Sequence, residues 1–344
     1  MEGLGHVAVM PEEVVAYLAP QRGGTYVDCT LGAGGHSRRI AQAMGAGRLI
    51  GFDKDPMALE AGRKAMAGAG VEFEAVQADF AEAAERLRER GVEQVDGVMA
   101  DLGMSSMQIS DAGRGFSFAA DGPLDMRMDP RQEVTAEQVV NQFSERELAD
   151  LIFQYGEERR SRRISRAIVR SRPLHSTAQL AALVAAVTRP MNVQRSRGPH
   201  PATRTFQALR IFVNSELTSL DRWLSQLPGL LKAGGRAVVI SFHSLEDRPV
   251  KQSFRAGAQA GLYKILTPHT VRPGAEEAAA NPRARSAKLR AIERLAHAGG
   301  GSAPGPLWVG SPMPHSARVR SGGGGSRLGI GKEAGHGCAF SPAN

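Results

Sequence analysis

Asp28-Cys29-Thr30-Leu31-Gly32-Ala33-Gly34-Gly35-His36 stands between a short apolar run, residues 25–28, and a helical pattern over residues 37–44. Glycines are needed at such a strand-to-helix turn because the backbone must bend sharply and let a ligand approach closely. The turn therefore predicts the first unit of a parallel α/β sheet, with a ligand site at the edge of that sheet.

The first hundred residues repeat this alternation of strand and helix. Four apolar runs predict strands, at residues 25–28, 48–53, 71–76 and 95–101. Helical patterns lie between them, one beginning near Pro56, at a position where proline is tolerated, and one at residues 81–90. Strands alternating with helices of this length predict a parallel sheet covered on both faces, an α/β fold of the Rossmann type.

The alternation stops after residue 103 and resumes after residue 213. Helical patterns lie in between, at residues 136–141, 145–154, 161–169 and 178–187. A long helix, a buried strand at residues 236–241 and a closing hairpin of residues 261–268 with 286–293 follow. We therefore predict a discontinuous sheet domain of residues 1–104 and 214–297. An all-helical domain, residues 105–213, is inserted into it. Residues 298–344 are rich in Gly, Ser and Pro and predict a disordered tail.

Positive charge is concentrated in the predicted insertion. Residues 151–215 hold twelve arginines, no lysine and two glutamates, a segment charge of +10 against +8 for the whole chain. Such asymmetry predicts a site for a polyanion, although a basic helix face that only meets water has the same composition. The candidate contacts to such a polyanion, RNA above all, are Arg159, Arg163, Arg166, Arg204 and Arg210, together with His243 beyond the insertion.

The bulk composition favours a globular protein of the cytoplasm. Hydrophobic residues make up 42% and charged residues 23% of the chain, the balance of a protein with a sizeable core. No apolar stretch reaches the length of a membrane span, and residues 1–11 lack a charged leader, so neither membrane insertion nor secretion is expected. Cys29 and Cys338 stand far apart and form no disulfide framework, which fits a reducing compartment.

The glycine turn alone fits NAD, a flavin, S-adenosylmethionine or a mere tight turn. Ser37 replaces the third glycine of the dinucleotide fingerprint, and an acid, Asp28, precedes the turn; both details favour S-adenosylmethionine. Asp53, about twenty residues downstream, is placed to accept bonds from both ribose hydroxyls. The alternative is that Asp53 caps the helix near Pro56, a role for which Asp55 competes.

Acids and a ring follow the other predicted strands. Phe80 comes directly after Asp79 and would lie near adenine, although it suits a core position equally well. Asp101 ends the fourth strand. Because ligands of open α/β sheets bind beyond the carboxyl ends of the strands, we expect Asp28, Asp53, Asp79 and Asp101 to converge on one crevice.

Longer motifs recur in order along residues 6–295. They are His6-Val7 with Glu12-Glu13, Asp28 to Ser37, Asp101-Leu102-Gly103-Met104-Ser105-Ser106-Met107-Gln108, Arg114 to Phe118, Gly122 to Met128, Tyr155 to Arg159, His200 to Arg210, Ser241 to Arg248 and Asn281 to Ser286. In these stretches the chain resembles the bacterial RsmH (MraW) family, the 16S ribosomal RNA cytosine-N4-methyltransferases.

The resemblance implies a Rossmann-like class I methyltransferase sheet with S-adenosylmethionine as cofactor. It implies methylation of the N4 amino group of a decoding-region cytidine in 16S ribosomal RNA of the small subunit, with the insertion as the substrate-recognition domain. The tail, residues 298–344, does not resemble the family, so the resemblance implies nothing about its role. The implied cofactor contacts are Gly34, Gly35, His36, Asp53, Phe80, Asp101 and Gln108.

Asp101 is also the candidate catalytic residue. A cytosine amino nitrogen is a poor nucleophile because its lone pair is delocalised into the ring, so the enzyme must position it and accept its protons. Amino-methyltransferases typically carry an Asp/Asn/Ser-Pro-Pro-aromatic turn after the fourth strand. Asp101-Leu102-Gly103-Met104 keeps the acid but has neither proline nor aromatic ring, so Asp101 serves either the amino group or the cofactor. Methylation at ring carbon C5 would need a cysteine thiolate, for which Cys29 and Cys338 are poorly placed.

Other readings remain open. No metal site is predicted, because the nine histidines are scattered and none stands at ligand spacing from acids. His243 either touches the substrate or caps the following helix. The same scaffold would serve methylation of DNA or of protein, or RNA binding by a non-catalytic assembly factor that retains a cofactor pocket. The sequence predicts no oligomeric state.

Overall fold

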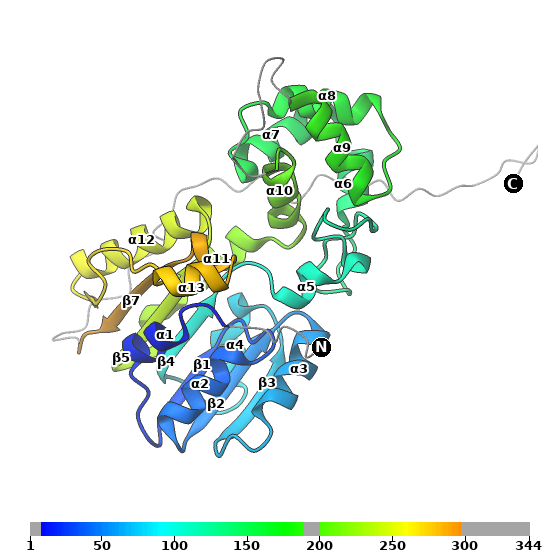
Figure 1. The fold of residues 1–344 in the computed structure, drawn as a ribbon. Helices are drawn as coiled ribbons and strands as arrows, with labels where there is room; N and C mark the ends of the chain where they lie inside the picture. Colours follow the sequence, from blue (N-terminus) through cyan, green and yellow to red (C-terminus); the bar gives the residue numbers. More distant parts are fainter. Residues whose placement is uncertain (1–7, 189–199, 297–344) are drawn as a thin grey trace, which may run out of the picture. The chain divides into compact units, whose positions relative to one another are not determined.

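Seven strands in the described residues, 8–188 and 200–296 of the computed structural model, form one sheet of order β3-β2-β1-β4-β5-β7-β6 (Figure 1). The first five strands in the chain run parallel, whereas β7 runs antiparallel to both of its neighbours. The strand bounds are β1 Thr25–Asp28, β2 Arg48–Asp53, β3 Glu72–Gln77, β4 Val95–Asp101, β5 Leu231–Ser241, β6 Tyr263–Ile265 and β7 Lys288–Arg294. The predicted α/β fold is confirmed.

Alternating side chains of the strands supply two cores, one on each face of the sheet. Tyr26 packs with Leu18 and Ile40 on one face, under α1 (Pro11–Leu18) and α2 (Gly35–Met44). Val27, the next residue of β1, packs with Trp223 and Leu87 on the other. This alternation follows from the period of two along a strand. The remaining helices flanking the sheet are α3 Pro56–Met66, α4 Ala83–Arg88, α11 Glu216–Leu230, α12 Ser244–Gln259 and α13 Ala275–Ala280.

Helices follow β4 before the chain returns to the sheet at β5. They are α5 Ser106–Ser110, α6 Ala136–Gln142, α7 Glu145–Gly156, α8 Ser161–Arg170, α9 Thr177–Thr188 and α10 Thr203–Val213. Thr135 and Ser144 begin α6 and α7 with capping boxes, in which the side chain accepts the N–H three residues on. The helix α10 was not predicted, yet it buries Phe206 and Phe212 against its neighbours.

Local differences from the predicted elements have local causes. The predicted helix at residues 81–90 is a 3₁₀ turn at Phe80–Glu82 followed by α4, and the Asp79 carboxylate begins the turn by accepting the N–H of Ala81 at 2.8 Å. The predicted hairpin strands do pair, but β7 lies between β5 and β6, so β6 is the edge strand. In the described ranges no helix combines the length and apolarity of a membrane span. The predicted tail, residues 298–344, lies outside the described residues.

Candidate active site

A cavity opens beyond the carboxyl ends of β1, β2 and β4. The strand order reverses between β1 and β4, and ligands of open α/β sheets bind at such a switch point. The volume of the cavity, counted to its open mouth, is about 920 Å³. Six of the seven implied cofactor contacts line it, namely Gly35, His36, Asp53, Phe80, Asp101 and Gln108.

Asp53 anchors the glycine turn to the second strand. Its Oδ2 accepts the N–H of Gly32 and its Oδ1 accepts the N–H of Asp55, both at 2.9 Å. Burial raises the pKa of this carboxyl to about 6, against the opposing pull of the two N–H groups. The helix α3 is capped by Asp55, whose Oδ1 accepts the N–H of Met57 at 3.0 Å, so the alternative that Asp53 is the cap is wrong.

Asp55 also joins the cavity wall to α5, a connection that the sequence analysis missed. Gln108 is buried, closes a capping box with Ser105, and donates from Nε2 to Asp55 Oδ2 at 3.0 Å. Arg114 forms an ion pair with the same oxygen at 2.9 Å. The bond from Gln108 to Asp55 fixes the orientation of the Gln108 amide and holds α5 against the residues that follow β2.

His36 and Asp101 present polar atoms that have no partner within the described chain. Asp101 donates its backbone N–H to Thr30 Oγ1 at 2.7 Å, and its Oδ2 lies 3.7 Å from His36 Nε2. Burial lowers the pKa of His36, but the carboxylates of Asp101 and Asp28 outweigh it and the net pKa is raised. Among described residues, neither ring nitrogen of His36 nor Oδ1 of Asp101 has a hydrogen-bond partner. Buried polar atoms of this kind fit a ligand with its own donors and acceptors.

Only two of the four strand-end acids face the cavity, so the expected convergence of all four is wrong. Asp28 is fully buried and accepts from Ser37 Oγ at 2.7 Å, which ties the strand to the start of α2. Asp79 pairs with Lys54 Nζ at 2.8 Å and accepts from Ser219 Oγ at 2.6 Å. These two carboxylates hold the sheet edge together, because each is satisfied by protein groups.

Gly34 is needed for packing, not for lining the cavity. It lies in the left-handed region with φ 80°, and a Cβ there would lie 3.0 Å from the Cβ of Ala65 and 3.2 Å from the Cα of Gly62 on α3. It is absent from the cavity lining, unlike its neighbours Gly32 and Gly35. Gly34 is therefore required for close helix packing, and the cofactor contact expected of it stays a prediction.

A second cavity adjoins the first and shares part of its wall. Both are lined by Gly103, Met104, Glu246 and Arg283. The second is otherwise lined by Ile109, Arg210, Phe242, His243 and Ser286. Arg283 joins the wall to the turn after β4 by donating from Nη1 to Ser106 Oγ at 2.8 Å.

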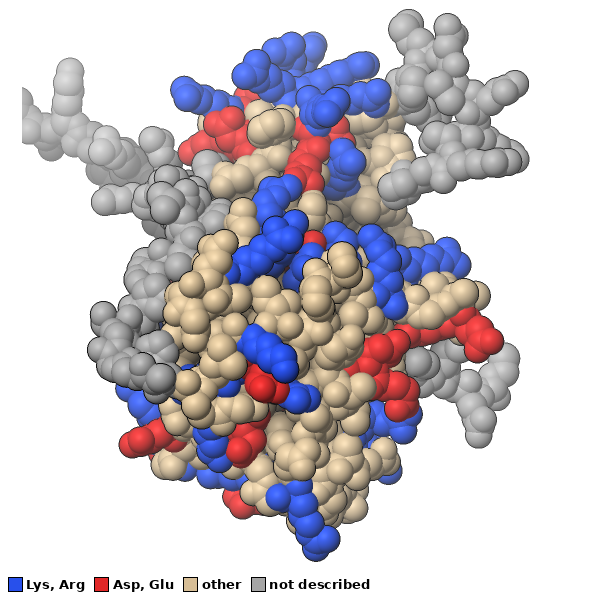
Figure 2. All heavy atoms as spheres, turned by 90° about the vertical axis from the view of Figure 1, so that its left-hand side faces the viewer, with Lys and Arg blue, Asp and Glu red and all other residues tan. Residues whose placement is uncertain are grey.

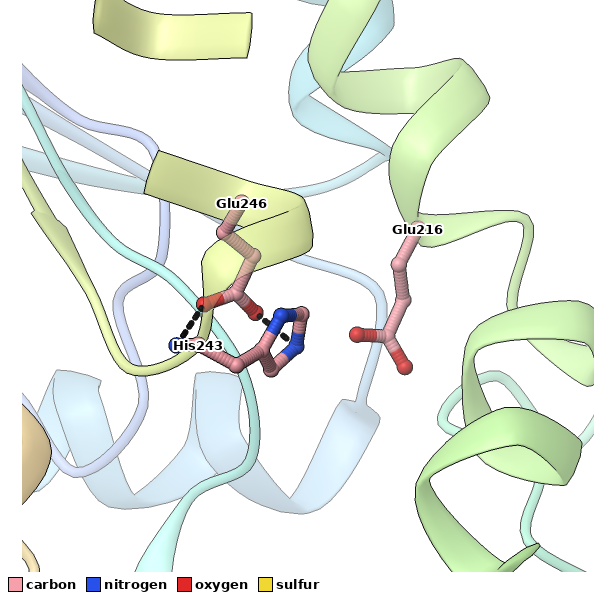
Figure 3. A group of neighbouring side chains, drawn as sticks. All are labelled: Glu216, His243 and Glu246. Atoms are coloured by element: carbon pink, nitrogen blue, oxygen red, sulfur yellow. Dashed lines mark hydrogen bonds and ion pairs between the residues drawn. The ribbon is translucent and has the colours of Figure 1, made fainter. Parts of the chain in front are cut away.

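Glu246 carries a buried negative charge between the two cavities. Its Oε2 accepts the N–H of Phe242 at 2.8 Å. Figure 3 shows its two contacts with His243, whose N–H donates to Oε2 at 3.4 Å and whose Nε2 lies 2.9 Å from Oε1. Burial raises the pKa of Glu246, but His243 and Arg210 outweigh it and the net pKa is lowered. Sequence reasoning gave neither Glu246 nor Arg283 a role, although the motifs Ser241 to Arg248 and Asn281 to Ser286 contain them.

Arg210 belongs to this internal network, which corrects its prediction as an RNA contact. The side chain is buried, and its Nε and Nη2 donate to the two oxygens of Glu216 at 2.7 and 2.8 Å. Glu216, His243 and Glu246 each offer an atom within 4.8 Å of the others, a cluster that the sequence positions of the histidines did not predict (Figure 3). The Arg210 guanidinium supplies a positive charge to this cluster, lying 3.8 Å from Glu246, and we assign no metal there.

The other predicted arginine contacts lie at the surface. Arg159 and Arg163 are exposed, and Arg166 pairs with Glu145 at 3.2 Å. Arg204 is exposed and donates to a backbone oxygen of α7. Figure 2 shows Lys and Arg side chains gathered most densely at the top of the view, the end at which Figure 1 places α8. Their contact with RNA stays a prediction.

Cys29 is a buried thiol on the cavity side of β1. Burial and the neighbouring Asp28 raise its pKa well above the ordinary value, so the thiolate is not formed near neutral pH. This agrees with the expected packing role. Cys338 lies outside the described residues.

The reversed strand order, the antiparallel β7 and the cavity at the switch point are the architecture of a class I methyltransferase. Residues 3–295 match the model of the MraW methylase family, and the chain belongs to that family of S-adenosylmethionine-dependent methyltransferases. Ribosomal RNA small subunit methyltransferase H of Koribacter versatilis is 54% identical over 302 residues, which cover 86% of this chain and 95% of that protein. The protein of the same name from Acidobacterium capsulatum is 54% identical over 302 residues, 86% of this chain and 100% of its own length. That from Cyanothece sp. is 49% identical over 290 residues, 84% of this chain and 95% of its own length.

Proposed function

We propose that this methyltransferase acts on ribosomal RNA of the small subunit in the cytoplasm, and that its product is N4-methylated cytidine in the decoding region of 16S ribosomal RNA. The proposal is supported by the names of relatives that match nearly their whole length. It is carried by one observation, the wall of Gly103, Met104, Glu246 and Arg283 that the cofactor cavity shares with a second cavity.

The residues of the first cavity fit S-adenosylmethionine. Asp53 would accept the ribose hydroxyls, Phe80 would lie against the adenine, and the unpartnered atoms of Asp101 and His36 would meet the polar groups of the methionine part. Gly35 lets the backbone approach, and Gln108, held by Asp55, adds a buried amide to the wall. When bound, S-adenosylmethionine supplies an electrophilic methyl group.

The second cavity would receive the cytosine ring. A planar ring there would lie against Phe242, with its amino edge toward Glu246 and Asp101. The free Oδ1 of Asp101 is an acceptor for the amino protons, and the anionic Glu246 stabilises the positive charge that develops on the nitrogen. Holding the nitrogen in line with the donor supplies several kcal/mol, by the order of magnitude of orientation effects.

The helical insertion, residues 105–213, would recognise the RNA around the target. The exposed arginines Arg159, Arg163, Arg166 and Arg204 would contact phosphates, and His243, at the rim of the second cavity, would contact the nucleotide. Specificity for the base would then come from the cavity, because phosphate contacts carry no sequence information.

Nucleoside mass spectrometry of ribosomal RNA tests the function. RNA from cells that lack the protein should lose N4-methylcytidine, and purified protein with S-adenosylmethionine should restore it on small ribosomal subunits. Methyl transfer to DNA or to a ribosomal protein, and not to RNA, would show that the proposed substrate is wrong. Cofactor binding without transfer to any of them would support a non-catalytic assembly factor.

A further inference from the structure

A groove lies where the ends of three helices meet, away from both cavities. It is formed by the last turn of α7, the first turn of α10 and the first turns of α12, and its volume is about 1170 Å³ counted to the open mouth. Its lining consists of an aromatic ring, an aliphatic side chain and a set of polar and charged residues: Phe153, Leu245, Gln154, Glu157, Arg159, Arg204 and Arg248.

Phe153 exposes its ring to solvent from α7, a helix whose other large apolar side chains are buried. It is 59% exposed, whereas Leu148, Leu151 and Ile152 of the same helix are buried. Within the described chain, the other large hydrophobic side chains at this level of exposure are aliphatic, Met57 and Leu295. An exposed ring flanked by cations is the platform on which single-stranded nucleic acids stack their bases.

Three arginines line the groove together with this ring, and Glu157 holds two of them. Glu157 pairs with Arg248 at 3.1 Å, and its backbone oxygen accepts from Arg204 Nη1 at 3.1 Å. Glu157 lies in the left-handed region with φ 49°, so its carboxylate is turned from α7 toward α12, where Ser244 Oγ donates to it at 2.6 Å. Arg159 meets no acidic side chain within the described residues. The groove therefore keeps a net positive charge, because its lining holds three arginines and one glutamate.

Gly156 allows this approach of α7 to α10. A Cβ at Gly156 would lie 2.6 Å from the backbone oxygen of Arg204, a distance at which the two helices would have to separate. Burying a glycine here brings the Arg204 end of α10 against the Glu157 end of α7. The spacing of the groove is thus built into the packing of the two helices.

The groove and the proposed site of the target base share no lining residue, but α10 and α12 each carry residues of both. Arg204 and Arg210 stand six residues apart on α10, about 9 Å along the helix axis, and Arg210 lines the second cavity. On the other side, His243 of that cavity immediately precedes α12, which carries Arg248. A strand whose target base enters the second cavity would therefore pass the groove with a neighbouring nucleotide.

We propose that this groove binds an unpaired nucleotide of the substrate RNA beside the target cytidine. Its base stacks on Phe153, and the phosphates next to it contact Arg159, Arg204 and Arg248. The proposal rests on the proposed function, and it adds a second base-binding position to that site. Stacking accepts any base, so this position holds the strand without reading its sequence.

Binding of a fluorescein-labelled, single-stranded RNA dodecamer with one central cytidine tests the groove. Phe153→Ala should weaken binding by about 5- to 150-fold, the loss of one stacked base, whereas Phe153→Tyr should stay within about 3-fold of the unaltered protein. Arg248→Gln should lower the slope of log affinity against log salt by about 0.7. Leu295→Ala, which removes an exposed apolar side chain elsewhere, should change nothing, and all variants should keep their affinity for S-adenosylmethionine.

Unchanged affinity of Phe153→Ala, or equal losses for Phe153→Ala and Phe153→Tyr, would overturn the stacking proposal. A variant that loses activity on small ribosomal subunits while binding the dodecamer normally would also overturn it, since a protein would then occupy the groove. The proposed function fails differently. In that case the unaltered protein binds the dodecamer through Phe153 but transfers no methyl group to the subunit.

Discussion

Asp53→Asn tests the cofactor site at the residue that supports it most directly. The carboxylate already accepts two backbone N–H groups at 2.9 Å, but its two oxygens have about four lone-pair sites, so two remain for a ligand. Asparagine keeps the shape, removes the charge and offers one oxygen. Loss of charge-assisted bonds to the ribose should cost about 1.5–3 kcal/mol, or roughly 10- to 150-fold in dissociation constant.

The pKa of Asp53 determines how the affinity for S-adenosylmethionine should change with pH. The pKa of Asp53 is raised from 3.8 to about 6, so below that pH the carboxyl is mostly protonated and the ribose hydroxyls lose the ionised acceptor. Affinity should be constant above pH 7 and about tenfold weaker at pH 5 than at pH 7.5. Stability without cofactor follows the opposite sign: this group's contribution is present below pH 3.8 and is lost as pH rises through about 6.

Titration calorimetry with S-adenosylmethionine at pH 5, 6 and 7.5 measures both effects. The matched control is Asp96→Asn, which changes an acid near the start of β4, at the opposite end of the sheet, where it pairs with Lys232 at 2.8 Å and does not line the cavity. It should bind within about 3-fold of the unaltered protein, the scatter of such substitutions at distant sites. Equal affinities for Asp53→Asn and the unaltered protein, or identical pH profiles, would refute the ribose contact.

Three further predictions address the RNA, the thiol and the candidate catalytic acid. Replacing Arg159, Arg163 and Arg166 by glutamine should lower the salt slope of RNA binding by about 0.7 per lost phosphate contact, and an unchanged slope in a filter-binding titration would make them a solvated face. Cys29→Ser should retain methyl transfer, because its pKa is raised and N4 transfer needs no thiolate; a folded, cofactor-binding variant without activity would contradict N4 chemistry. Asp101→Ala should reduce turnover by about 10²-fold or more. If calorimetry shows unchanged cofactor affinity, the loss belongs to the contact with the amino group. Full activity would exclude both a cofactor contact and an amino-group contact.

The local sequence pattern predicted the glycine turn and the positions at the ends of the strands. Gly35, His36 and Asp53 line the cavity as expected, because the carboxyl ends of parallel strands meet at one edge whatever the helices around them do. Asp28 and Asp79 stand at equivalent sequence positions, yet protein groups satisfy them. The pattern places an acid at the edge but does not say which neighbour its carboxylate will meet.

Only the tertiary structure decided the contacts that join distant segments. Gln108 meets Asp55 across 53 positions, and Glu157 meets Arg248 across 91. The sequence predicts Arg210 to be a surface cation. In the structure the turn between α10 and α11 buries its side chain against Glu216. Periodicity of three to four residues specifies each helix and its buried face, because those follow from neighbours along the chain. The angle and distance at which two helices pack depend on side chains from both, and no local pattern encodes that pairing.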